Sequence, residues 1–283
     1  MTNTLSSGTP DDKTPAAAAS TQCRLCDATA AAAFALDLIG KHHVRYYRCE
    51  GCGSLQTEQP YWLDEAYSNS NLAMLDTGVA QRNMSNLAAV YAWVRLTGIR
   101  TVVDVGGGDG LLCRLLRDYR IDARLEDRYA SNTYAQGFES DQRYSPVLYT
   151  AFEVLEHYAD PKHDLGMLFD SRPDAVVVTT ALYEGQDANW WYLTPDSGQH
   201  VFFYTRKAMA IIAARFGYTV DFAGHYTIFS KERPGQITML AAKAAMGGIG
   251  TRLLRSGLML LPARGAVSDF KRIANQQIDN SNH

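Results

Sequence analysis

The chain has 283 residues, of which 46% are hydrophobic and 20% are charged, as in an ordinary globular protein of one or two domains. Its 27 Lys and Arg residues are nearly balanced by 30 Asp and Glu residues, giving a net charge of -3. This balance argues against sequence-independent nucleic-acid binding, which rests on phosphate neutralisation by basic side chains. No run of about 18 apolar residues occurs, so we expect no transmembrane helix.

Residues 1–20 are rich in Ser, Thr, Pro and Ala and lack the basic-then-apolar order of an export signal. We therefore expect a disordered tail and a cytoplasmic protein. Residues 21–58 contain two C-x2-C motifs, "CRLC" and "CEGC", with 22 residues between them. In a reducing compartment, two such motifs are typical of a structural zinc site in which thiolates fill all four positions. The predicted zinc ligands of this ribbon-like module are Cys23, Cys26, Cys49 and Cys52.

Residues 59–98 are expected to form a linker and a helix, because apolar residues from Val79 onward have helical spacing and Gly98 suits a helix C-cap. From residue 99 to 245, β-branched runs alternate with helical runs, which predicts a Rossmann-like, doubly wound α/β sheet. The expected strands are 101–105, 123–127, 147–151 and 175–180, and the expected helices are 110–119, 130–137, 161–169 and 205–216. The last two strands, 226–229 and 237–242, predict a terminal antiparallel hairpin because no helical run separates them.

The C-terminal tail, residues 246–283, mixes apolar residues with Arg252, Arg255 and Arg264 and is interrupted by Gly and Pro. A terminal helix packed on the body, followed by a frayed end, is the simpler interpretation. A segment that contacts a membrane surface or a partner is the alternative.

The segment "VVDVGGGDG" joins the first of these strands to a helix. Gly106, Gly108 and Gly110 alternate, with Gly107 between the first two, whereas the dinucleotide fingerprint G-x-G-x-x-G has a wider second interval. The carboxylate of Asp104 would repel a diphosphate but suits a cationic ligand. Both features favour S-adenosylmethionine, which carries a sulfonium, an ammonium group and no phosphate. A tight turn without a ligand is the alternative.

The next expected strand ends in "EDRYA", and a carboxylate at this place can accept hydrogen bonds from ribose hydroxyls. Together, "DVGGGDG", "EDRYA" and "AFEVLEHYADP" resemble the class I S-adenosylmethionine-dependent methyltransferases over residues 72–245. The resemblance implies that S-adenosylmethionine is the cofactor. The cofactor-binding residues expected on this basis are Asp104, Gly106, Gly107, Gly108, Gly110, Asp127, Phe152 and Glu153.

Two histidines are candidates for the general base. Glu156 and His157 belong to the third motif, and "GQHVFFYT" resembles a segment of sugar and natural-product methyltransferases in which His200 would take part. Because the pKa of histidine lies near neutral pH, His157 or His200 beside the cofactor could accept a proton. For Glu156 and His157, local packing and capping of the next helix are the alternative. The resemblance further implies that Tyr67 and Arg82 lie near the methionine carboxylate.

The aromatic segment 182–205 is expected to line a substrate pocket. A zinc module before such a domain also resembles the sugar C-methyltransferases. We therefore expect methylation, on oxygen or carbon, of a small polar acceptor such as a sugar, nucleotide-sugar or glycan precursor. An RNA or protein methyltransferase guided by the zinc module is one alternative, and a non-catalytic zinc-ribbon scaffold is another.

Overall fold

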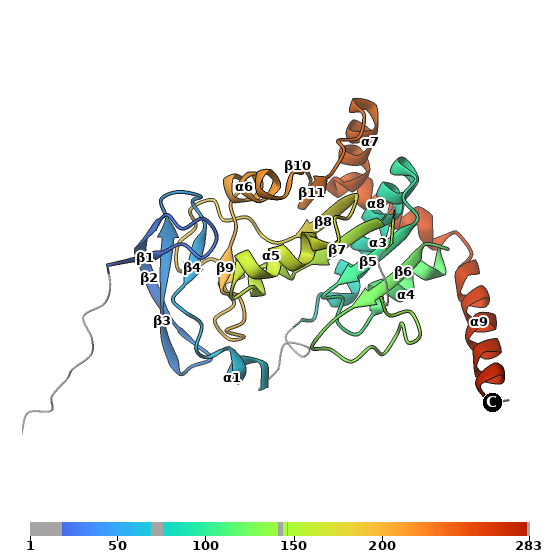
Figure 1. The fold of residues 1–283 in the computed structure, drawn as a ribbon, viewed down its shortest axis with the longest axis horizontal. Coiled ribbons are helices and arrows are strands. Elements are labelled where there is room, and N and C mark those ends of the chain that lie inside the picture. Colours follow the sequence, from blue (N-terminus) through green and yellow to red (C-terminus); the bar gives the residue numbers. More distant parts are fainter. Residues whose placement is uncertain (1–18, 69–75, 141–143, 146, 282–283) are drawn as a thin grey trace, which may run out of the picture.

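The computed structural model describes residues 19–68, 76–140, 144–145 and 147–281, so nearly all of the expected disordered tail lies outside the described residues. The described strands form two sheets (Figure 1). One is the central sheet, which helices flank. The other is built mainly from N-terminal residues and lies at the opposite end of the molecule from the C-terminus.

The strands of the central sheet are β5 Thr101–Val105, β6 Asp122–Glu126, β7 Val147–Phe152, β8 Ala175–Thr179, β10 Thr219–Ala223 and β11 Tyr226–Ser230. Their order in space is β10-β11-β8-β7-β5-β6. The four strands from β8 to β6 are parallel, and the β10–β11 hairpin adds an antiparallel edge. This arrangement confirms the predicted Rossmann-like sheet with a terminal hairpin.

Helices cover both faces of the central sheet, because successive strand residues point to opposite sides. Val102 packs in a core with α3, α4, α7 and α8, whereas Val103 packs in a core with α5 and α6. Helices were expected at residues 79–98, 110–119, 161–169 and 205–216. The structure has a helix at each of these places, and the observed ends differ from the expected ends by about one residue. The bounds are α3 Val79–Thr97, α4 Leu111–Asp118, α5 Pro161–Asp170, α6 Arg206–Phe216, α7 Gln236–Met246 and α8 Gly248–Met259.

The second sheet is antiparallel and has the order β1-β2-β3-β4-β9. Its strands are β1 Ser20–Gln22, β2 Thr29–Leu38, β3 His42–Cys49, β4 Leu55–Thr57 and β9 Phe202–Phe203. The last strand comes from the aromatic segment far along the chain, and Gln56 pairs with Phe202. The N-terminal module therefore shares its sheet with the segment that carries His200.

The expected strand at 237–242 is wrong, because these residues lie in α7. The sequence there is rich in Ala, Leu and Met, which favour helix. The buried residues Met239, Ala242 and Met246 recur at helical spacing and pack on the central core. The strand that pairs with β11 is β10, residues 219–223.

The expected helix at 130–137 is also wrong, because no helix forms between β6 and β7 among the described residues. Asn132 uses its side-chain Oδ1 to accept the backbone N–H of Ala135 at 2.9 Å, a local bond that competes with helix formation. The backbone N–H groups of Thr133 and Tyr134 instead donate to the carbonyl of Asp109, each at 2.9 Å. This loop thereby packs on the glycine-rich turn.

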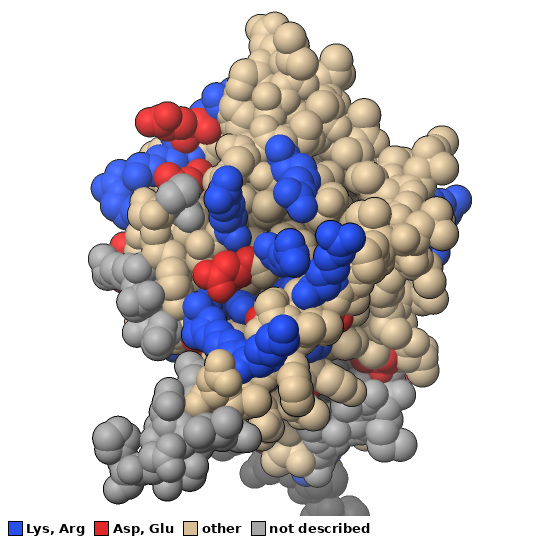
Figure 2. All heavy atoms as spheres, turned by 90° about the vertical axis from the view of Figure 1, so that its right-hand side faces the viewer, with Lys and Arg blue, Asp and Glu red and all other residues tan. Residues whose placement is uncertain are grey.

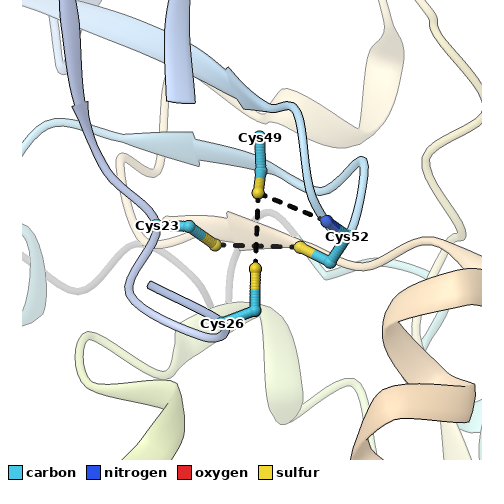
Figure 3. Close-up of side chains that lie close together, drawn as sticks. All are labelled: Cys23, Cys26, Cys49 and Cys52. Carbon is cyan, nitrogen blue, oxygen red and sulfur yellow. Dashed lines mark hydrogen bonds between the residues drawn. The ribbon is translucent and has the colours of Figure 1, made fainter. Parts of the chain in front are cut away.

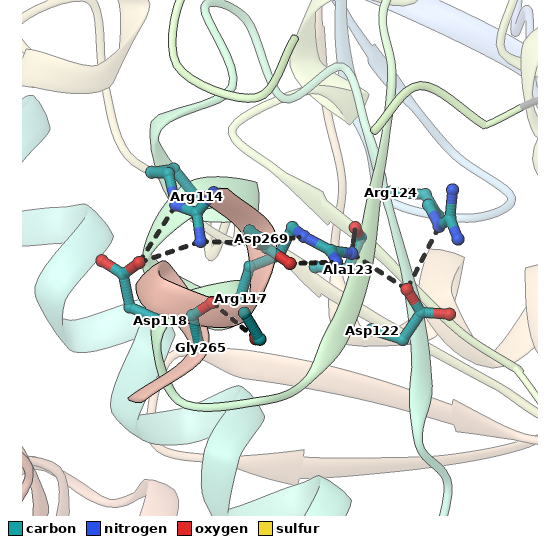
Figure 4. Close-up of polar contacts among 9 residues, drawn as sticks. Arg114, Arg117, Asp118, Asp122, Ala123, Arg124, Gly265 and Asp269 are labelled. Atoms are coloured by element: carbon teal, nitrogen blue, oxygen red, sulfur yellow. Dashed lines mark hydrogen bonds and ion pairs between the residues drawn. The ribbon is translucent and has the colours of Figure 1, made fainter. Parts of the chain in front are cut away.

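The C-terminal residues form α8 and a further helix, α9 Arg264–Ser281, which packs on α4 as the simpler interpretation expected. Figure 4 shows the contact: Asp269 receives two hydrogen bonds of 2.8 Å from Arg117 and one of 2.8 Å from Arg114. Burial alone would raise the pKa of Asp269, but the hydrogen bonds from Arg117 and then Arg114 lower it below its ordinary value. Gly265 lies against the carbonyl of Arg117, where a larger side chain would clash. None of the described helices is long and apolar enough to cross a membrane.

Candidate active site and cysteine cluster

The glycine-rich turn between β5 and α4 leaves open space above its backbone. The three alternating glycines all have positive φ, a conformation that glycine adopts without steric cost. A side chain on Gly107 would collide with Asp104, whose Oδ2 would lie 2.3 Å from the added Cβ. A Cβ on Gly108 would meet nothing within 4 Å. Gly107 therefore faces the protein, and Gly108 faces the space in which a ligand would lie.

Asp104 lies beneath this turn and is only 2% exposed. Its Oδ1 accepts a 2.7 Å hydrogen bond from the hydroxyl of Thr150 on β7, and its Oδ2 has no hydrogen-bond partner among the described residues. Burial raises the pKa of Asp104 to about 7, although the bond from Thr150 opposes the rise. Asp104 thus lies buried beneath the turn and is bonded to β7, and its part in binding the cofactor stays a prediction.

Asp127 lies beside the turn, one residue beyond β6. Its Oδ2 accepts the backbone N–H of Gly108 at 2.9 Å, and its Oδ1 accepts those of Tyr129 and Ala130 at 2.8 and 2.7 Å. These bonds fix the carboxylate at the rim of the open space. Each carboxylate oxygen has two lone pairs, so Oδ2 can still accept a hydrogen bond from a ribose hydroxyl.

The end of β7 lies next to this turn because β7 pairs with β5. Phe152 ends the strand, and its ring meets that of Tyr226 edge-on at 5.9 Å. Glu153 follows with a φ of 55°, an uncommon conformation for a residue other than glycine. Its backbone N–H donates to the carbonyl of Thr179 at 3.0 Å, which holds this conformation. Such strain occurs often at functional sites.

A hydroxyl group links the two glutamates of the third motif. The hydroxyl of Tyr192 lies 2.7 Å from Oε1 of Glu156 and 2.9 Å from Oε2 of Glu153. Burial, and then the charge of Glu153, raise the pKa of Glu156 to about 8. Since Tyr192 has one proton to donate, a protonated Glu156 that donates to Tyr192, while Tyr192 donates to Glu153, accounts for both short contacts.

The two candidate bases lie together, with ring centroids 4.9 Å apart. Nδ1 of His200 lies 2.7 Å from the backbone carbonyl of Tyr192, so it carries the proton and leaves Nε2 as the acceptor. Burial, and then the proximity of His200, lower the pKa of His157 to about 3, and burial lowers the pKa of His200 as well. Both imidazoles are therefore neutral at pH 7, the state required of a base.

Glu156, His157 and His200 can also hold a divalent cation, because their ligand atoms lie within 4.8 Å of one another. The second oxygen of Glu156 is buried without a hydrogen-bond partner among the described residues, which leaves it free as a ligand. One carboxylate and two neutral imidazoles are a donor set that several transition metals accept.

The resemblance implied that Tyr67 and Arg82 lie near the methionine carboxylate of the cofactor. In the structure, the two side chains contact different residues. The hydroxyl of Tyr67, at the end of α1 Leu63–Ser68, lies 3.3 Å from Nδ1 of His157. Arg82 on α3 forms an ion pair with Asp76, which raises the pKa of Arg82. Tyr67 thus contacts His157, whereas the guanidinium of Arg82 is already paired with Asp76.

The aromatic segment contributes less to a pocket surface than its composition suggested. Trp191 is 74% exposed and Trp190 is partly buried. The other aromatic residues are all buried: Tyr183, Tyr192, Phe202, Phe203 and Tyr204. No local pattern could predict that the hydroxyl of Tyr192 reaches two glutamates, because Tyr192 lies 36 and 39 residues from them in the chain.

The four cysteines of the N-terminal module converge, as Figure 3 shows. The Sγ atoms of Cys23 and Cys52 are 3.7 Å apart, and those of Cys26 and Cys49 are 3.5 Å apart. Zinc–sulfur bonds of about 2.3 Å in a tetrahedron require sulfurs about 3.8 Å apart, whereas a disulfide requires about 2.05 Å. The backbone N–H of Gly51 donates to Cys49 Sγ at 3.3 Å, which favours a thiolate. The donor set therefore fits zinc.

The loop between the first two cysteines contacts the segment that carries His200. The guanidinium of Arg24 donates to the carbonyl of Val201 at 2.6 Å and to that of Ala159 at 3.2 Å. The N–H of Val201 in turn donates to the carbonyl of Glu156 at 2.8 Å. Burial lowers the pKa of Arg24 to about 10, which still leaves it charged at neutral pH. The cysteine cluster and the two histidines are thus parts of one hydrogen-bonded structure.

Comparison with protein families identifies the family of the chain. The family described as "Methyltransferase domain" matches residues 67–221, more than half of the chain. The chain belongs to this methyltransferase family. The matched region of the methyltransferase contains the glycine-rich turn and both histidines. No curated protein matches the chain.

Several solved structures are similar to this methyltransferase at low identity. Human N-acetylserotonin methyltransferase is 17% identical over 53% of this chain and 52% of its own, with a TM-score of 0.38. NcsB1, an O-methyltransferase from neocarzinostatin biosynthesis, is 17% identical over 59% and 58% of the two chains, with a TM-score of 0.43. A Burkholderia thailandensis 1,6-didemethyltoxoflavin-N1-methyltransferase is 12% identical over 66% and 93%, with a TM-score of 0.44. The chain spans about half the length of the human enzyme. Structural similarity at such low sequence identity does not indicate which acceptor this methyltransferase uses.

The buried position of Asp104 predicts a pH-dependent effect of Asp104→Asn on stability. A raised folded-state pKa means that the stability Asp104 contributes is complete below its ordinary pKa of 3.8 and is lost as pH rises through about 7. The Asn variant lacks this loss, so its free energy of unfolding should gain on the wild type by about 4 kcal/mol between pH 4 and pH 8. Urea denaturation of the ligand-free protein at both pH values measures this; a constant difference would contradict the assignment.

Proposed function

We propose that this methyltransferase transfers the methyl group of S-adenosylmethionine to a hydroxyl oxygen, or alternatively a carbon, of a small polar acceptor such as a sugar, nucleotide-sugar or glycan precursor. The observation that supports it most is the pair of imidazoles, His157 and His200, whose ring centroids lie 4.9 Å apart, with His157 in a segment that contacts the glycine-rich turn through Val154 and Gly106. When bound, S-adenosylmethionine supplies a methyl group activated by its sulfonium. We infer that Gly106, Gly107, Gly108, Gly110, Asp127, Phe152 and Glu153 form its site, with Asp104 as the support beneath.

We further propose that His200 is the general base. Its Nε2 is free to accept a proton, and its Nδ1–H is held by the carbonyl of Tyr192, which fixes the tautomer and stabilises the imidazolium that forms. His157 packs edge-on against it, and burial lowers the pKa of His200 and so keeps it neutral before the reaction. Glu156, buried below, shares a proton with Glu153 through the hydroxyl of Tyr192.

The cysteine module, we propose, binds zinc and positions His200. Zinc bound by four thiolates would be structural, because no position is left for a substrate. It would fix the loop that carries Arg24, and Arg24 holds Val201, the neighbour of His200. The pairing of β4 with β9 fixes the same segment from its other side. No guiding role in RNA or protein recognition is needed to explain these contacts.

Replacement of His200 by Ala should lower kcat by about a hundredfold or more, because it removes the base. His157→Ala should have a smaller effect, and His163→Ala, on the exposed side of α5, should have none. Calorimetry should show unchanged S-adenosylmethionine affinity in all three, which separates loss of the base from loss of the cofactor.

Since the pKa values of both histidines are lowered, the acid limb of the wild-type kcat profile should lie below pH 6.5. If His200→Ala keeps wild-type turnover, or if the acid limb lies above neutrality, His200 is not the base. A chelator that abolishes turnover without removing zinc would instead indicate that Glu156, His157 and His200 bind a cation.

Zinc content and turnover should fall together when a cysteine ligand is lost. Cys23→Ser should release the metal, as measured by elemental analysis of the purified protein, and should lower kcat because the Arg24 loop is no longer fixed. Cys113→Ser changes a buried cysteine outside the cluster and should keep the zinc. Arg24→Met should keep zinc but lower kcat. Full zinc occupancy in Cys23→Ser would contradict the assignment of the cluster.

A further inference from the structure

The last three helices carry an unusual share of the exposed apolar surface. Of the sixteen large apolar side chains exposed on the described surface, nine lie between Ile237 and Phe270. They are Ile237, Leu240, Ile249, Leu253, Met259, Leu260, Leu261, Val267 and Phe270. A protein that stays isolated in water rarely exposes so much apolar surface in one region. These helices also lie beyond residue 221, where the family match ends.

The exposed apolar residues of α8 form a stripe on its outer side. Ile249 and Leu253 are four residues apart and are 77% and 70% exposed, and Leu260 continues the same stripe past the helix end. The opposite side of α8 packs on the body through the buried Thr251 and Leu258. The helix thus has two apolar sides, of which only one is covered by the protein.

The same division holds for α9. Gly265 and Asp269 face α4, and the buried ion pairs of Asp269 fix the helix in this orientation. Val267 and Phe270, which are 60% and 73% exposed, lie on the other side. Because α9 is held by specific ion pairs, the exposure of Phe270 is a consequence of its docking and not of a loose terminus.

Positive charge surrounds these apolar residues. Residues 236–283 contain six Lys or Arg and only two Asp or Glu, a net charge of +4, whereas the rest of the chain has a net charge of -7. One of the two acidic residues, Asp269, is buried. Figure 2 shows Lys and Arg side chains gathered on the side of the molecule that carries α9. Arg252, Arg264 and Lys271 are exposed next to the apolar residues.

We propose that the outer side of α8 and α9, with the turn Leu260–Ala263 between them, binds to the surface of an anionic membrane. Apolar side chains that enter the headgroup region, flanked by Lys and Arg that contact anionic headgroups, are how interfacial helices bind. A second copy of this chain would place the same positive charges opposite one another. A nucleic acid would use the charges but leave the apolar residues exposed to water.

Co-sedimentation of the full chain with lipid vesicles tests this proposal. The wild type should bind vesicles of equal parts phosphatidylcholine and phosphatidylglycerol, should bind pure phosphatidylcholine at least about tenfold more weakly, and should be released by salt. The double variant Leu253→Asp/Leu260→Asp should lose at least about tenfold in affinity. Tyr134→Asp, which alters an exposed aromatic residue elsewhere, should bind like the wild type. All these positions are exposed, and equal melting temperatures will show that the variants fold.

Absence of binding to the anionic vesicles, or equal binding by Leu253→Asp/Leu260→Asp, would overturn the proposal. So would a wild-type dimer, seen by light scattering, that Leu253→Asp/Leu260→Asp converts to a monomer while vesicles bind neither form. Retention on single-stranded RNA without retention on vesicles would overturn it as well. The assay contains no S-adenosylmethionine, so its outcome is independent of the methyl-transfer proposal.

Discussion

Parallel pairing of β5 with β7 decides where the candidate site lies, because it brings two distant motifs to one edge of the sheet. Thr101 pairs with Val147 and Asp104 with Thr150, so both strands end at the same level. The glycine-rich turn that follows β5 and the segment Glu153–His157 that follows β7 are then neighbours. The hydrogen bond between Asp104 and Thr150 joins the two strands just beneath.

A second pairing, between β4 and β9, completes the site from a different part of the chain. It places Phe202 beside Gln56 and leaves His200 two residues before the paired strand. The cysteine loop adds the contact of Arg24 with Val201. The N-terminal module therefore takes part in the catalytic domain's structure, and the division of the chain at residues 58 and 98, drawn from composition, does not describe how its sheets are built. The domain boundaries stay predictions, since shared strands do not define where a unit folds alone.

The sequence predicted the central strands and most helices because local patterns specify them: β-branched runs, amphipathic spacing and glycine caps. It failed where short-range signals were ambiguous. Residues 237–242 are apolar enough for a strand, but their Ala and Met content favours the helix that packs on the core. Residues 130–137 contain polar side chains that bond to their own backbone. The glycine-rich turn could be identified from the spacing of its glycines alone. In the structure, the three alternating glycines have positive φ, where other residues are disfavoured.

Contacts between distant segments could not be predicted in the same way. The burial of Asp104, the bonds of Tyr192 to Glu153 and Glu156, and the approach of His200 to His157 all depend on tertiary packing. The motif "EVLEH" identified Glu156 and His157 as a pair, and "GQHVFFYT" identified His200 separately. Only the fold shows that the three side chains form one cluster, and that neutral imidazoles result from their burial.

Calorimetric titration of S-adenosylmethionine into the purified chain tests whether the glycine-rich turn binds this cofactor. We expect one-to-one binding by the wild type and loss of binding in Gly108→Val, whose added side chain would project into the open space above the turn. At the positive φ of residue 108 a β-branched side chain costs more than the roughly 1–2 kcal/mol of an ordinary residue, so an unchanged melting transition must first show that the variant folds. A folded wild type that binds no S-adenosylmethionine, or a Gly108→Val variant that binds it equally well, would contradict the account.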